Sequence, residues 1–181
     1  MKLKNLTITL LIFSSVVIQA QIIKSKLDVV AGVSAREYFH LGLRYQYADI
    51  AQLGAYVGND LEFKGDQSIT TFCIDNQIHF GKLSFHNNRP VWYARQGYTF
   101  SSNVLGAQET RRYSYFDLSL GREFSISDHV GVNADTGMLL QFREYRKTNP
   151  PLETPLRTNW FVMPLLRLQV ALSLFSQNRI P

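Results

Sequence analysis

Cysteine is nearly absent from this 181-residue chain, which contains only Cys73. A single cysteine cannot form an intramolecular disulfide, although an exported compartment would permit one. Long apolar runs and segments with helical periodicity are also missing beyond the N-terminal stretch. Since a membrane helix needs about 20 consecutive apolar residues, a mature protein that lies in a membrane must cross it with strands.

The one apolar run is at the N-terminus. Lys2 and Lys4 precede an apolar stretch over residues 6–17. A basic start, an apolar region of about a dozen residues and a small residue before the cut describe a secretory signal peptide. The run is too short for a membrane-spanning helix. The sequence therefore predicts a signal peptide over residues 1–20 and one exported domain over residues 21–181.

The net charge of the chain is also small. Removing Lys2 and Lys4 from 19 basic residues leaves 17 against 14 acidic residues, a net charge of +3. This mildly basic balance lacks the strong cationic excess of nucleic-acid-binding domains, so no nucleic-acid partner is expected. Aromatic residues make up 13% of the chain and include nine tyrosines, a composition that fits a β-rich fold.

What the chain has is apolar and polar residues that alternate with a period of two. The clearest stretch, residues 113–143, reads as a hairpin around a turn at residues 127–129. Such alternation is typical of strands. Loops are expected over residues 101–112 and 144–159, the latter because prolines exclude a central strand. Eight strands are predicted, at residues 27–34, 38–47, 51–57, 69–81, 92–100, 114–124, 130–143 and 160–175. The predicted fold is an all-β, eight-stranded antiparallel up-and-down transmembrane β-barrel.

Alternation alone does not say which face meets water. A soluble lipocalin-like carrier places its apolar residues inside, and a membrane barrel places them outside. Connection lengths alternate between short and long, and aromatic residues of the apolar face cluster near strand ends, as in outer-membrane barrels. The polar face also has almost no lysine, whereas a solvated sheet would use lysine freely. These features favour the membrane barrel and keep the soluble carrier as an alternative.

The polar face then becomes the barrel interior. Its four acidic residues and four arginines are predicted to form a luminal ion-pair network, which consists of Arg44, Asp75, Arg95, Asp117, Glu123, Asp135, Arg143 and Arg167. A barrel of eight strands is just wide enough to be filled by side chains. A plugged lumen is favoured, and a narrow porin-like channel is the alternative.

Candidate catalytic and metal-binding groups are sparse. Lipid-modifying barrels use an exposed histidine with a serine or aspartate near the outer rim. His40 has Ser34 and Glu37 nearby in sequence, but their spacing matches no catalytic motif. Histidine and cysteine also lack the paired spacing of metal sites. The protein is therefore not expected to be an enzyme or to need a cofactor, and a lipid-modifying barrel enzyme remains the alternative.

Basic residues gather in or beside the predicted long loops. They are Arg111, Arg112, Arg146, Lys147 and Arg157. A cationic outer rim could bind the phosphates of lipopolysaccharide. Ordinary solvated loop charge is the alternative.

Several segments resemble a known family. Residues 115–121 (YFDLSLG) and 130–137 (VGVNADTG) are similar in style to late hairpins of barrels from the Bacteroidetes, and Phe175 resembles the terminal aromatic of such barrels. The chain thus resembles the small OmpA/OmpX-type, or porin-family, barrels of Gram-negative bacteria. The resemblance implies an outer-membrane location, lipid contacts and the barrel insertion machinery as a partner. Family members have diverse roles, so a structural or loop-mediated interaction role is the prediction.

Overall fold

A computed structural model describes residues 26–35, 38–60, 67–85, 89–106, 109–148 and 160–174. The predicted signal peptide and Phe175 lie outside these residues. Within the described part of the chain, no helix is long and apolar enough to span a membrane.

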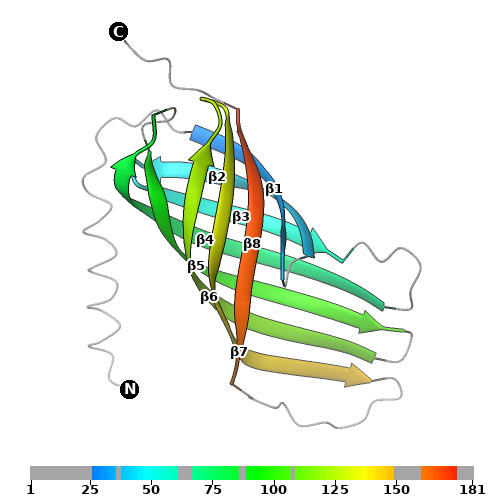
Figure 1. Cartoon of the computed structure of the whole chain (residues 1–181). Coiled ribbons are helices and arrows are strands. Elements are labelled where there is room, and N and C mark those ends of the chain that lie inside the picture. The colour runs from blue at the N-terminus through cyan, green and yellow to red at the C-terminus, as the bar shows by residue number, and fades with distance from the viewer. Residues whose placement is uncertain are drawn as a thin grey trace.

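The described residues form eight antiparallel strands that close into a ring (Figure 1). Each strand pairs with the next along the chain, and β1 closes the ring by pairing with β8 from Asp28↔Ser173 to Ser34↔Arg167. The predicted all-β, up-and-down barrel of eight strands is therefore confirmed. The strands are β1 (Lys26–Ser34), β2 (Tyr38–Ala48), β3 (Ala51–Asn59), β4 (Gln67–Leu83), β5 (Pro90–Leu105), β6 (Glu109–Ser125), β7 (Val130–Thr148) and β8 (Phe161–Ser173).

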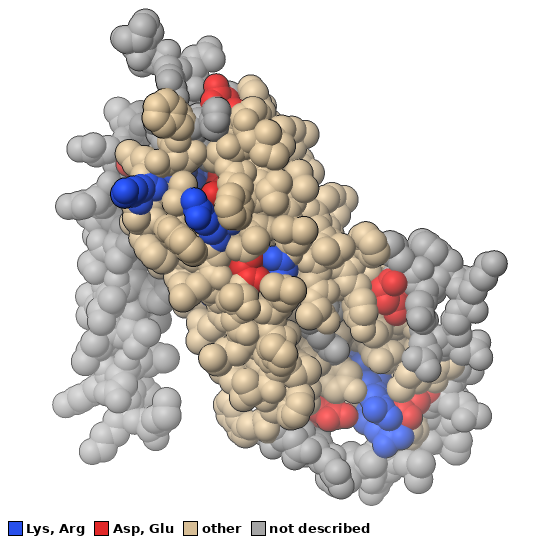
Figure 2. All heavy atoms as spheres, in the orientation of Figure 1, with Lys and Arg blue, Asp and Glu red and all other residues tan. Residues whose placement is uncertain are grey.

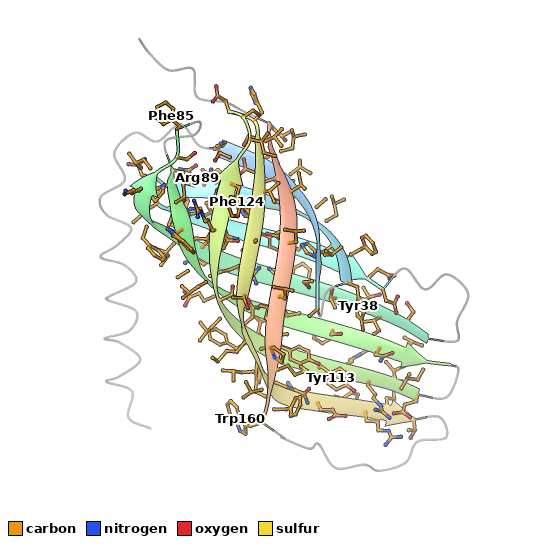
Figure 3. The ribbon with its side chains drawn as sticks, viewed as in Figure 1. Tyr38, Phe85, Arg89, Tyr113, Phe124 and Trp160 are labelled. Atoms are coloured by element: carbon orange, nitrogen blue, oxygen red, sulfur yellow. The ribbon has the colours of Figure 1, made fainter. Side chains whose placement is uncertain are left out.

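The two ends of the barrel differ. At one end the described chain begins with Lys26 and stops with Leu174, and short connections join β2 to β3 and β6 to β7. We name this the terminal end. The other end, the loop end, carries the connection of residues 149–160 between β7 and β8. Figure 3 shows Phe85 at the terminal end and Trp160 at the loop end.

Strands β4 to β7 continue past the rest of the barrel at the loop end. The last pair between β3 and β4 is Asn59↔Thr70, and the last pair between β7 and β8 is Gln141↔Phe161. Beyond these pairs the four long strands form a projecting sheet, visible at the lower right of Figure 1. We name this sheet the extension; it comprises residues 67–69, 101–105, 109–114 and 142–148.

The extension corrects two loop predictions. Residues 101–112 were expected to be a loop, yet β5 runs to Leu105 and β6 already begins at Glu109. Residues 144–148 were also expected to be a loop, and they belong to β7. Both faces of the sheet are largely polar here, so the alternation that marks a half-buried strand is weak. Backbone pairing across the hairpins maintains the strands without that signal.

A β-bulge interrupts β7 where the extension begins. Tyr115 pairs with Gln141, but the preceding residue, Ser114, pairs with Arg143, so Phe142 is an extra residue. Because successive side chains of a strand point to opposite faces, one inserted residue moves every later side chain to the other face. The faces of residues 143–148 are therefore the reverse of those that simple alternation predicts.

Candidate functional site

A buried cluster of charges lies in the barrel interior. Seven of the eight residues predicted for the luminal network are buried there, with exposed fractions of 6% or less. Arg95 is central to the cluster. Its guanidinium lies 3.1 Å from Asp135, 3.4 Å from Asp75 and 3.5 Å from Asp117. Arg167 adds a second cation 3.4 Å from Asp75. One arginine thus bridges carboxylates from β4, β6 and β7.

Arg44 lies in the same interior but has neutral partners. Its Nε donates to the hydroxyl of Tyr56 at 3.2 Å, and its Nη2 donates to Oε1 of Gln169 at 2.7 Å. The tyrosine hydroxyl in turn lies 3.4 Å from Oδ1 of Asp75. Arg44 is therefore linked to the carboxylates through a tyrosine and does not pair with them directly.

A second polar cluster lies near the terminal end. Nη1 of Arg89 donates to Oε2 of Glu123 at 3.1 Å and lies 3.7 Å from Asp28, and its Nη2 donates to Gln46 at 2.9 Å. Figure 3 shows Arg89 at this end of the barrel. Asp28 also accepts a hydrogen bond of 2.6 Å from Ser173, which ties β1 to β8. The barrel is thus cross-linked where the ring closes.

Asp28 and Arg89 are both missing from the sequence-based network. Asp28 alternates with the apolar residues Leu27 and Val29, so the parity rule could have found it. Arg89 precedes Pro90 in a turn region that has no periodicity. Only the closed ring shows that its side chain reaches Glu123, 34 residues away in sequence.

Glycines of the polar face make room for buried tyrosines. A Cβ placed on Gly121 would lie 2.3 Å from Cζ of Tyr93, and a Cβ on Gly54 would lie 2.3 Å from the hydroxyl of Tyr56. The rings therefore occupy space that any larger residue would fill. From that position the hydroxyl of Tyr93 donates to Asp135 at 3.1 Å.

An apolar layer follows on the loop side of the ionic cluster. Tyr115, Leu139 and Leu165 are buried together inside the barrel, with Tyr113 and Met163 packed against them. An ion crossing the barrel would have to pass both the cross-linked charges and this apolar layer. Buried ion pairs and an apolar cluster thus follow one another along the described part of the interior.

The prediction that Arg143 lies in the lumen is wrong. It is exposed and lines a pocket on the outer face of the barrel together with Phe100 and Arg112. The bulge at Phe142 is the physical reason, because it reverses the facing of every later residue of β7. A bulge leaves no clear mark in the sequence, so alternation alone placed Arg143 inside.

The predicted cationic patch is divided by the sheet. Arg111 and Arg146 both contact Glu109 on the inner side of the extension, and the distance from Arg146 Nη2 to Glu109 Oε2 is 2.8 Å. The side-chain hydrogen bond from Arg146 is the largest cause that lowers the pKa of Glu109 below its ordinary value, and the bond from Arg111 is the second. Arg112 and Lys147 have the opposite parity and face outward, whereas Arg157 lies outside the described residues.

Two of the histidines that the structure describes, His40 and His79, are buried in the interior and make polar contacts. His79 lies between the carbonyl oxygen of Pro90 and Oε1 of Gln52, at 2.9 Å from each. Nε2 of His40 is 2.9 Å from Nε2 of Gln169, and its ring packs edge-on against Tyr56. Both rings are thus buried among interior side chains.

Comparison of the chain with protein-family models, with curated proteins and with solved structures finds no match. Function must therefore be inferred from the geometry of the barrel.

Proposed function

We propose that the protein is an outer-membrane β-barrel with a side-chain-filled lumen and a structural or interaction role at its loop end. The observation that carries this proposal is the reversed polarity of the barrel. Leu118 on the wall is 42% exposed and Leu166 is 68% exposed, whereas Arg95 inside is 1% exposed. A water-soluble barrel has the opposite arrangement, because soluble proteins rarely expose a large continuous apolar surface.

The outer wall supports a lipid environment. Large apolar side chains from all eight strands are exposed on it, and uncharged residues cover most of the wall in the view of Figure 2. We name this surface the apolar belt. Closure of the ring also pairs the backbone around the belt, which hydrocarbon requires of any spanning structure.

Aromatic side chains at both margins of the belt support the same environment. Tyr45, Trp92 and Phe124 are exposed near the terminal end, and Phe72 and Phe100 are exposed near the loop end. Amphipathic and aromatic rings favour the interface between hydrocarbon and headgroups. The resemblance to OmpA/OmpX-type barrels agrees with this orientation, in which the short turns face the periplasm.

One arginine on the apolar face fits this orientation. The guanidinium of Arg122 lies 5.4 Å from the ring centre of Trp92 and 5.0 Å from that of Phe124. A long basic side chain can extend along apolar rings and keep its charge at the membrane surface. Its position beside two rim aromatics suits a contact with headgroups.

Fractionation and gel migration test the location. The protein is expected in the outer-membrane fraction, to need detergent for extraction, and to migrate differently on gels before and after boiling. Recovery from the aqueous fraction without detergent would contradict the proposal and select the soluble carrier.

Planar lipid bilayer recordings test the closed lumen. Purified protein is expected to give no sustained conductance, because bridged charges and an apolar layer fill the interior. Stable channels would select the porin-like alternative. A changed lipid A mass in membranes of overexpressing cells would instead select the lipid-modifying enzyme.

A further inference from the structure

A pocket of about 320 Å³ opens on the outer wall where the apolar belt meets the extension. It is lined by residues of three adjacent strands, namely Tyr98, Phe100, Arg112, Ser114, Arg143 and Tyr145. Tyr113, labelled in Figure 3, marks its level on β6. The pocket is separate from the luminal network because its lining residues face outward.

A small residue and the bulge together create the pocket. Ser114 lies between Phe100 on one side and Arg143 on the other in the row of paired residues across the sheet. It is only 6% exposed although it faces outward, because larger neighbours surround it. Its hydroxyl accepts a hydrogen bond of 3.1 Å from the hydroxyl of Tyr98. Ser114 therefore forms the floor, and the bulge directs Arg143 to the rim.

The pocket concentrates positive charge. On the outer face of β6 and β7 within the extension, the described residues that pair across the two strands are Thr110, Arg112, Ser114, Arg143, Tyr145 and Lys147, with no carboxylate among them. Arg112 and Arg143 are diagonal neighbours across the strand pair, a spacing that long side chains can bridge. On the inner side of the same strands, Glu109 binds Arg111 and Arg146. The two faces of one hairpin thus differ in charge.

The level of the pocket on the wall indicates the ligand. The neighbouring row toward the terminal end is apolar and contains Ile74, Tyr98, Phe116, Leu140 and Val162, whereas Thr70, Ser102 and Arg112 begin the polar side. A lipid in contact with this wall has its chains along the apolar row and its headgroup at the pocket. The arginine fork matches the geometry of a phosphate.

We propose that this pocket binds the phosphate of an anionic membrane lipid at the outer rim of the barrel. The inference rests on the proposed membrane location. In this arrangement Arg112 and Arg143 bind the phosphate oxygens. Tyr98, Phe100 and Tyr145 contact the glycerol or sugar part and the first methylenes, which a free phosphate ion lacks.

Native mass spectrometry of the full-length chain in detergent tests the proposal with two lipids of equal chain length. Dimyristoyl-phosphatidylglycerol is expected to stay bound, and dimyristoyl-phosphatidylcholine, whose phosphate is screened by choline, is expected to bind more weakly. Arg112→Gln with Arg143→Gln should lower phosphatidylglycerol binding about tenfold or more, since each arginine supplies charge-assisted hydrogen bonds.

The matched control is Arg111→Gln with Arg146→Gln. It removes the same amount of charge from a cross-strand pair of the same two strands, one position beyond Arg112↔Tyr145 and on the inner side, and it should change binding less than about twofold. Equal losses in the two double variants would overturn the pocket and leave general charge attraction. Ser114→Leu keeps both arginines and fills the floor, so it should also weaken binding; unchanged binding would equally overturn the pocket.

Two further measurements distinguish a free-anion site and a wrong membrane location from the proposed lipid site. Excess inorganic phosphate is expected to leave the lipid bound, and displacement by it would overturn the lipid assignment in favour of a free-anion site. Gel migration before and after boiling monitors folding of every variant. If the wild type is heat-modifiable and enters the outer membrane but does not bind phosphatidylglycerol, this inference fails and the proposed location stands. If the wild type is recovered without detergent, the location itself fails.

Discussion

The closed barrel and the extension consist of the same strands in different surroundings. In the closed part, β5 and β6 bury Arg95 and Asp117 on one face and expose Leu118 on the other. Nearer the loop end of β6, Arg111 and Arg112 project on opposite sides of the sheet. Arg111 is partly exposed there and Arg112 is exposed. Alternation persists in both regions, but only the closed part sorts side chains by polarity.

This contrast shows what ring closure adds to a hairpin. Inside the ring, charges from distant strands are held together away from water, where their pairing has a large effect. In the extension, ion pairs stay near water and contribute little. Ion pairs of the same residue types therefore contribute differently to stability, depending on whether they lie in the closed part of the barrel or in the extension. Figure 2 shows the largest exposed group of charged side chains at the lower right, over the extension of Figure 1.

The largest effect is expected from Arg95→Ala. It leaves Asp75, Asp117 and Asp135 buried without their shared cation, a loss that costs about 3–5 kcal/mol of unfolding free energy. Urea unfolding in phospholipid vesicles measures the change. In the extension, Arg146→Ala should cost far less, because the side chain is 43% exposed. Similar costs at the two positions would contradict the contrast between the regions.

The next effect compares two apolar residues of equal exposure on the outer face. Leu118 in the closed part and Val104 in the extension are both 42% exposed. Leu118→Arg should destabilise the protein by about 2–4 kcal/mol in bilayers if it lies near the midplane, whereas Val104→Arg should have almost no effect outside the hydrocarbon. The measurement is vesicle unfolding of both variants. Equal tolerance of arginine would remove the distinction between belt and extension.

A smaller effect tests the packing of the lumen. Gly121→Ala places a Cβ 2.3 Å from the ring of Tyr93, and the resulting overpacking should cost about 1–3 kcal/mol. Gly131→Ala is the control, since its Cβ would have its nearest neighbour 3.5 Å away, at Glu123. Thermal unfolding in detergent, followed by gel migration, compares the two. A loss at Gly131 as large as that at Gly121 would show that the lumen is not filled as described.

The smallest effect concerns the ion pairs of the extension. The hydrogen bonds from Arg146 and Arg111 lower the pKa of Glu109, so its contribution to stability is present above the ordinary pKa of glutamate. It is lost as the pH falls through the lowered pKa of the folded state. NMR titration of the side-chain carboxyl should give a midpoint below the ordinary one. Arg146→Gln should move that midpoint upward; an ordinary midpoint in the unmodified protein would exclude the bond.

Much of the closed barrel could be predicted from the sequence because its strands separate apolar from polar residues. Asp75, Arg95, Asp117 and Asp135 lie inside as alternation indicates. Arg44 also lies inside, but alternation could not show that Tyr56 would be its partner. Pairing partners depend on the order and stagger of strands around the ring, which periodicity does not contain.

The extension was harder to predict for a different reason. Residues 101–105 and 109–112 are strands with polar side chains on both faces, so the period-two signal has little contrast there. Arg143 was assigned to the wrong face because one extra residue, Phe142, shifts the register. Arg111 and Arg112 are sequence neighbours in one basic cluster, yet the sheet sends them to opposite faces.

The sequence by itself determined the number of strands, their order and, in the closed part of the barrel, the chemical difference between their faces, because alternation acts locally within each strand. The tertiary structure alone decided which charges meet, how far the long strands project and which arginines line the outer pocket. These features depend on ring closure, cross-strand register and one bulge, and each of them relates residues that are far apart along the chain.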